Sequence, residues 1–163
     1  MNIKEAKAFL QTRLNPEVIK TYRQYGFSIN GMISSNDWEV FAAILFDEKK
    51  KAKGSDLENY EIKSSKEEGG GVEYQYHKDG GLDKIKEDKR VKHVFITYSE
   101  EYKNISVRII EGKQLTERYF DVWEKGIQPN YAKGASNKRY RRSISRGFVK
   151  KHGRLILEIN NEE

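Results

Sequence analysis

The first third of the chain has the apolar spacing of helices. Apolar residues three and four positions apart predict a helix over residues 3–14. Asn15 followed by Pro16 is a typical helix start, because the asparagine side chain can accept from free N–H groups and proline lacks an N–H that would need a partner. We expect this second helix to reach about Tyr25 and to end at Gly26.

A third helix is expected next, with Ser35 or Asn36 as its cap and an apolar face made of Trp38, Phe41, Ala42 and Leu45. Residues 49–54 are a polar break. The later segments alternate between apolar and polar residues, which is typical of strands. The expected strands are residues 60–64, 72–77, 93–98 and 105–110, and a closing pair at 144–149 and 154–159 that turns at His152 and Gly153.

Two further helices are expected among these strands. One covers residues 82–90, and the other covers 113–125 and ends at Gly126. The second helix should turn inward Leu115, Tyr119, Val122 and Trp123. Helices followed by strands with helices between them predict an α+β (or α/β) domain, a mixed central sheet flanked by helices. We expect a single domain, 1–163, with a helical N-terminal region at 1–47 and the sheet core at 54–163.

Composition narrows the class of protein. Aromatic residues make up 12% of the chain, which argues against disorder. The absence of cysteine excludes disulfides, zinc sites with thiolate ligands and cysteine nucleophiles. There is no apolar run as long as a membrane span, and the N-terminus lacks the apolar core of a secretory signal. We therefore expect a cytoplasmic protein with no membrane partner.

Positive charge is concentrated in one segment. The formal net charge is +6, and residues 125–154 hold ten Lys or Arg and no Asp or Glu, whereas residues 1–124 are close to neutral. A basic segment of this kind attracts polyanions, of which nucleic acid is the most common. The alternative is an ordinary solvated basic surface. We interpret residues 125–154 as a basic loop that faces double-stranded DNA.

The most specific chemistry lies just before and within the first expected strand. Glu61 and Lys63 should project to one side of that strand and Ile62 to the core, because side chains alternate. Asp56 precedes them by a few residues and could bring a second carboxylate alongside. Asp56, Glu61 and the Ile62 carbonyl are hard oxygen ligands of the kind Mg²⁺ prefers. With Lys63 to orient water or neutralise charge, the set is complete for phosphodiester hydrolysis, although Glu-x-Lys alone is also common on exposed strands.

These residues carry a resemblance to a known family. Asp56 followed by Glu61-Ile62-Lys63 resembles the motif of the PD-(D/E)xK nuclease superfamily, and the order of the later segments is similar to that of its type II restriction endonucleases. The resemblance implies a restriction-endonuclease-like fold, with Asp56 and Glu61 as metal ligands and Lys63 as the catalytic lysine. Four residues separate Asp56 from Glu61, fewer than the family usually has, so Glu39 is a possible substitute ligand.

Candidate DNA-binding residues lie in two segments. Basic and amide side chains can neutralise phosphates or read base edges in the major groove. In the strand at 72–77 we expect Tyr74 and Tyr76 to face the core, and Gln75 and His77 to face outward and contact bases. The resemblance also places base-contacting histidines near His77. The candidates are Gln75, His77, Lys78, Lys133, Asn137, Lys138, Arg139, Arg141, Arg142 and Arg146.

The sequence supports three functional hypotheses. The leading one is a type II restriction endonuclease of a restriction-modification system, which hydrolyses double-stranded DNA at a short specific site with Mg²⁺, as a homodimer matched to a palindrome and joined through its N-terminal helices. The second is a DNA-recognition domain of a restriction system without catalysis, in which Glu61 and Lys63 are ordinary strand residues. A basic RNA- or ribosome-associated protein is the third, and it uses only the charge.

Overall fold

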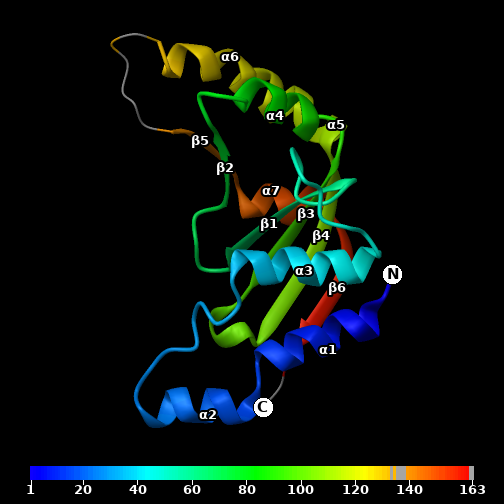
Figure 1. Cartoon of the computed structure of the whole chain (residues 1–163), viewed down its shortest axis with the longest axis vertical. Helices are drawn as coiled ribbons and strands as arrows, with labels where there is room; N and C mark the ends of the chain where they lie inside the picture. Colours follow the sequence, from blue (N-terminus) through cyan, green and yellow to red (C-terminus); the bar gives the residue numbers. More distant parts are fainter. Residues whose placement is uncertain (133, 135–138, 162–163) are drawn as a thin grey trace.

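The computed structural model describes residues 1–132, 134 and 139–161. Three helices precede the first strand, and strands and helices are mixed along the rest of the chain (Figure 1). The helical elements are α1 (Ile3–Arg13), α2 (Pro16–Gln24), α3 (Ser35–Phe46), α4 (Gly81–Asp88), η1 (Glu100–Tyr102), α5 (Gly112–Leu115), η2 (Thr116–Phe120), α6 (Asp121–Asn130) and α7 (Arg146–His152). The strands are β1 (Tyr60–Lys66), β2 (Val72–Tyr76), β3 (Lys92–Tyr98), β4 (Asn104–Glu111), β5 (Tyr140–Ile144) and β6 (Arg154–Asn160).

The described strands form a mixed central sheet and a separate ribbon. The sheet has the order β1-β3-β4-β6, in which β1 and β3 run parallel and the remaining pairs are antiparallel. The ribbon is the antiparallel pair β2–β5. The connection from β1 to β3 passes through β2 and α4, which is the crossover that a parallel pair requires. The predicted α+β class, with helices around a mixed sheet and helices at the N-terminus, is confirmed.

The two faces of the sheet belong to different cores. Ile62 of β1 and the alternate residues of β3 and β4 pack with α1 and α3. The opposite face, which includes Phe95 and Ile110, packs with the ribbon, α4, α6 and α7. In Figure 1, α4 and α6 lie at the top of the molecule and α2 at the bottom. Glu61 and Lys63 therefore project from β1 toward the ribbon and α4.

The N-terminal helices begin where their caps predict. Asn15 accepts from the backbone N–H groups of Glu17 and Val18, and Gly26 has the positive φ of a helix end. The third helix is capped one residue earlier than expected, since Ser34 and Asp37 form a reciprocal capping box. Its predicted apolar face is buried. No helix in the described part of the chain is long and apolar enough to span a membrane.

The prediction that Gly126 ends a helix was wrong. The segment continues from α5 through a π-helical turn, η2, and through Gly126 to Asn130. The π turn adds a residue to one helical repeat and rotates the residues of α6 relative to those of α5. As a result Phe120 is buried, whereas Val122, expected to face inward, is 61% exposed.

The prediction of a strand over 144–149 was also wrong. Ser145 accepts from the backbone N–H of Phe148 and starts α7, which buries Val149. The strand of this region lies earlier, as β5, and pairs with β2 rather than with β6. Residues 125–154 are therefore not one loop, because they include the end of α6, β5 and α7.

Candidate active site

The strand β1 presents its motif residues as the alternation predicts. Glu61 and Ile62 are both buried, on opposite faces, and Lys63 is partly exposed beside Glu61. The Lys63 ammonium lies 2.7 Å from Oε1 of Glu61. It also lies 4.8 Å from the ring centroid of Tyr74 on β2, where the π face attracts a cation. Lys63 is thus held between an acid and an aromatic ring.

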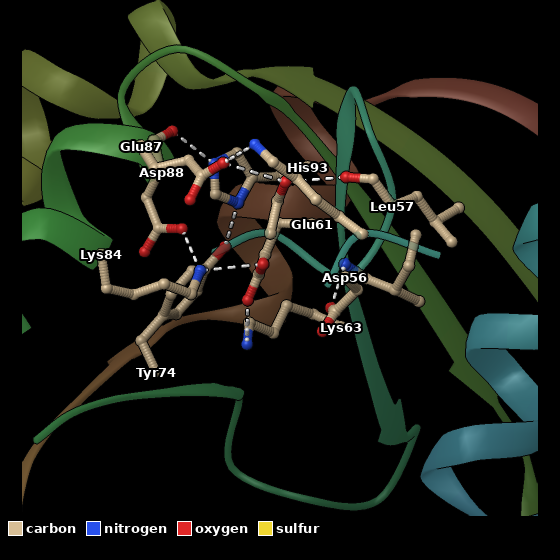
Figure 2. A network of polar contacts seen from close by, with 12 residues as sticks. Asp56, Leu57, Glu61, Lys63, Tyr74, Lys84, Glu87, Asp88 and His93 are labelled. Atoms are coloured by element: carbon tan, nitrogen blue, oxygen red, sulfur yellow. Dashed lines mark hydrogen bonds and ion pairs between the residues drawn. The ribbon is translucent and has the colours of Figure 1, made fainter. Parts of the chain in front are cut away.

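A tight turn brings Asp56 to the edge of β1. The Leu57 N–H donates to the Tyr60 carbonyl at 2.9 Å, so the chain reverses within four residues. Oδ2 of Asp56 accepts from the Ile62 N–H at 2.8 Å. Because the N–H and C=O of one strand residue point to the same edge, the Ile62 carbonyl also faces the edge where Asp56 lies. The short spacing therefore still places Asp56 beside the Glu61-Ile62-Lys63 stretch (Figure 2).

The negative charge of Asp56 is only partly balanced by its neighbours. Burial, and then the negative charge of Glu61, raise the pKa of Asp56 to about 6, although the Ile62 N–H and the Lys63 ammonium lower it. The charge of Glu39 on α3 also raises this pKa, while the Glu39 carboxylate is paired with Lys50 at 2.9 Å. Asp56 therefore lies where a cation would relieve an unfavourable charge.

Glu61 has the opposite electrostatic environment. Its two oxygens contact two ammonium groups, since Lys63 lies 2.7 Å from Oε1 and Lys84 of α4 lies 2.8 Å from Oε2. Burial alone would raise the pKa of Glu61, but the two ammonium groups lower it to about 2. Glu61 is consequently an ionised carboxylate in a buried position.

The network continues from Lys84 into the core (Figure 2). Lys84 is also paired with Asp88, one helical turn further along α4, and Asp88 accepts from the Tyr76 hydroxyl at 2.9 Å. Burial raises the pKa of Asp88. The carboxylates of Glu61 and Asp88 raise the pKa of Lys84 against the effect of burial, so the ammonium form is favoured.

His93 closes this network into a ring. Its Nε2 lies 2.7 Å from the Asp88 carbonyl, which can only accept, so Nε2 carries the proton. Burial lowers the pKa of His93 to about 4, so the ring is neutral at pH 7 and its Nδ1 accepts from the Tyr74 hydroxyl at 2.8 Å. Tyr74 in turn lies beneath Lys63. The contacts run through Glu61, Lys84, Asp88, His93, Tyr74 and Lys63, and return to Glu61.

The residues expected to hold Mg²⁺ fit a cation in part. Asp56 and the Ile62 carbonyl face one edge of β1, and burial together with the charge of Glu61 raises the pKa of Asp56. Glu61 is neutralised by its two lysines. Among the described residues, no group of three or more His, Asp or Glu side chains could hold a metal ion. A site here would therefore use two carboxylates and a carbonyl, with water completing the shell.

A groove of about 490 Å³ runs past this cluster. It meets Glu61 through Lys84, and its described lining holds three acids and two lysines: Lys53, Gly54, Gln75, His77, Asp79, Gly80, Gly81, Asp83, Lys84 and Glu87. Gln75 accepts from Arg139 at 3.1 Å and is paired with Arg141 across the ribbon. Two predicted base readers thus share one groove with the lysine that contacts Glu61.

The other predicted DNA-binding residues lie at several places. Arg141 and Arg142 are exposed on β5, and Arg142 lies over the Tyr140 ring at 4.3 Å. Lys78 is exposed in the loop before α4. Arg146 of α7 donates to the Lys66 carbonyl at 2.7 Å and lines a different hollow. The predictions for Lys133, Asn137 and Lys138 lie outside the described residues.

Sequence reasoning missed Lys84, and gave Asp88 no role. The two residues are four positions apart on a helix, so they share a face. This spacing was visible in the sequence, but it could not show that the face lies against β1. Comparison with protein-family models finds no match for the chain, and comparison with the curated proteins finds no similar one. The chemistry of the site therefore rests on its own geometry.

Proposed function

We propose that this protein is a Mg²⁺-dependent endonuclease that hydrolyses double-stranded DNA at a short specific site, as type II restriction endonucleases do. The single observation that carries the proposal is the position of Asp56 at the edge of β1, bonded to the Ile62 N–H, next to the strand face from which Glu61 and Lys63 project. One carboxyl there is short of positive charge, and a lysine stands beside the other. This arrangement agrees with the resemblance to the PD-(D/E)xK nucleases.

The chain supplies distinct groups for the reaction. A bound Mg²⁺ would lower the pKa of a water molecule and stabilise the charge that develops on the phosphate oxygens. Asp56, Glu61 and the Ile62 carbonyl would hold it. Lys63 can orient the attacking water from its position beside Glu61, and the ring of Tyr74 limits the directions the ammonium can take. The buried His93 network keeps Tyr74 in place.

The ribbon supplies a surface for DNA. A two-stranded antiparallel ribbon fits the major groove of B-DNA. The buried face of the β2–β5 ribbon carries Tyr74 and Tyr76, so Gln75 and Arg141 project from the other face. Amide and guanidinium groups can bind adenine and guanine edges in bidentate fashion. The ribbon would thus read a sequence beside the groove that Gln75 shares with Lys84.

The test of hydrolysis is direct. Plasmid DNA incubated with the protein and Mg²⁺ should give discrete fragments, and EDTA should abolish them. Lys63→Ala should reduce the rate at least about hundredfold, because a positioned lysine contributes that much to proton transfer and charge stabilisation. Lys66→Ala is the matched control, since it removes an exposed lysine from the same strand. Intact plasmid under all conditions, or equal rates for the two variants, would contradict the proposal.

One observation favours a second function. Both oxygens of Glu61 are already neutralised by lysines, as in a structural ion cluster. A DNA-recognition domain without catalysis needs no more than the ribbon and its basic residues. Sequence-selective binding that persists in EDTA, without cleavage in Mg²⁺, would support this function over hydrolysis.

A further inference from the structure

Lys84 stands where the groove meets the buried carboxylates. Its ammonium contacts Oε2 of Glu61 and a carboxylate oxygen of Asp88, and its side chain is still 26% exposed. The described lining of the groove includes Lys84, together with Gln75 and His77, but not Lys63. Of the two lysines on Glu61, Lys84 is therefore the one that a molecule in the groove would meet.

The two lysines are also held differently. Lys63 projects from a sheet strand and lies over the Tyr74 ring, so its position is fixed on two sides. Lys84 projects from the first turns of α4, which follows an exposed loop with Gly80 in a left-handed conformation. Its long side chain could reach from Glu61 toward the open groove by rotation alone, since lysine has several freely rotating bonds.

The position of Lys84 on Glu61 conflicts with a metal ion at the same carboxylate. A divalent cation and an ammonium group repel each other strongly at close range in a buried site. Without Lys84, however, Asp88 would lose this ammonium partner and Glu61 would keep only Lys63, which is unfavourable for buried carboxylates. Lys84 thus neutralises both acids in the free protein, and a cation on Glu61 would leave it paired with Asp88 alone.

We propose that Lys84 is a second phosphate-binding lysine of the active site, which neutralises Glu61 and Asp88 in the free protein and transfers to a phosphate oxygen of DNA in the groove when a divalent cation binds Glu61. The proposal rests on the proposed function for the identity of the phosphate. It explains why a lysine that lines an open groove is turned toward buried acids. In this role the Lys84 ammonium would bind a phosphate in the groove directly beside Glu61 and Asp88.

The test compares Lys84→Met with Lys86→Met. Lys86 is exposed on the same helix, so both variants lose one positive charge from α4. Titration with Mn²⁺ in the absence of DNA should show about tenfold tighter binding to the Lys84 variant, because the competing ammonium is gone. Binding of a short DNA duplex in EDTA should weaken about tenfold more in the Lys84 variant than in the Lys86 variant, because Asp88 loses its ammonium partner and Glu61 keeps only Lys63. At saturating Mg²⁺ its cleavage rate should fall about hundredfold.

These readouts separate the proposal from a structural role and from the proposed function. If Lys84 only fixes α4 to β1, its loss lowers stability and leaves Mn²⁺ affinity unchanged or weaker, which overturns the proposal. Should the single variant fail to fold, the double variant Lys84→Met with Asp88→Asn preserves the charge balance and carries the same Mn²⁺ prediction. Absence of cleavage by the wild type refutes the nuclease, whereas equal behaviour of the Lys84 and Lys86 variants refutes only the role of Lys84.

Discussion

Two carboxylates of the candidate site differ in pKa because their neighbours differ. Glu61 is the more buried residue, yet two ammonium groups keep it ionised. Asp56 has one backbone N–H as its hydrogen-bond donor and receives the repulsion of Glu61. Functional sites often contain neighbouring acids whose pKa values are shifted in opposite directions, and structural ion-pair networks shift pKa values as well.

The raised pKa of Asp56 predicts a gain in stability on neutralisation. Its pKa is about 6 in the folded chain against 3.8 for the free side chain, so the folded state holds the extra proton between these values. Stability is therefore lost as pH rises through this range, and the full cost, of order 3 kcal/mol, is present above pH 6. Asp56→Asn should thus increase the free energy of unfolding by about 1–3 kcal/mol at pH 8 and by little below pH 4.

Urea unfolding at the two pH values measures this difference. Asp79→Asn, at an exposed carboxyl, is the control and should show no such pH-dependent gain. The Asp56 variant should be more stable and unable to cleave DNA, a combination expected of a residue whose charge serves function. A variant less stable than wild type at pH 8 would contradict the electrostatic account of Asp56.

The sequence was sufficient to predict which side chains of β1 face the site. Period-two alternation correctly separated Ile62 from Glu61 and Lys63, because each strand residue faces away from its neighbours. The contacts of Lys84 with Glu61 could not be predicted in this way. They depend on α4 packing against the sheet face that carries Glu61, which is decided by the crossover from β1 to β3 and not by any local pattern.

At the scale of elements, the errors have local physical causes. The helix over 113–125 was predicted with a regular 3.6-residue repeat, and the π turn at Thr116–Phe120 shifted its inward face from Val122 to Phe120. In the segment 144–149, apolar residues at each end suggested a strand, but the Ser145 cap started a helix. The strand β5 was also missed, because it lies in the segment predicted as a basic loop, whereas the helices α1, α2, α3 and α4 and the strands β1, β2, β3, β4 and β6 were predicted with the correct type.

The ribbon predicts a salt-dependent loss of DNA affinity on charge reversal. Arg141 and Arg142 are neighbouring exposed residues of β5, opposite Gln75 and Tyr74. Arg141→Glu with Arg142→Glu should weaken DNA binding more than about tenfold and reduce the slope of log affinity against log salt by about 2, because each phosphate contact contributes nearly one. Affinity measured by fluorescence anisotropy from 50 to about 200 mM salt tests both effects.

Reversing a pair of lysines outside the ribbon tests whether DNA binding depends on the ribbon or on the positive charge of the whole basic segment. Lys150 and Lys151 are exposed on α7 and belong to the same basic segment. Reversing both to Glu makes the same change in net charge outside the ribbon. If the two double variants weaken binding equally, general positive charge and not the ribbon accounts for DNA binding.

At the scale of the whole molecule, the sheet separates Glu61 and the groove from the N-terminal helices. The Ile62 face of β1 packs with α1 and α3, and the Glu61 face meets the ribbon and α4. Figure 1 shows α2 at the end of the molecule opposite α4 and α6. A contact between two copies through α2 would therefore leave the groove of each copy open to DNA.

The exposed apolar residues of this end predict a homodimer. In the described chain α2 buries none of its residues, and Val18, Tyr22, Tyr25 and Phe27 are between 41% and 69% exposed. Clustered exposed apolar side chains commonly mark a protein interface, and a symmetric dimer would match a palindromic site.

Light scattering coupled to size exclusion should give about twice the monomer mass of 19.1 kDa, and Val18→Glu with Tyr22→Glu should give the monomer. Thr12→Glu with Lys20→Glu, which adds charge to the same region without removing an apolar side chain, should weaken the dimer less. A monomeric wild type at micromolar concentration would contradict the predicted homodimer.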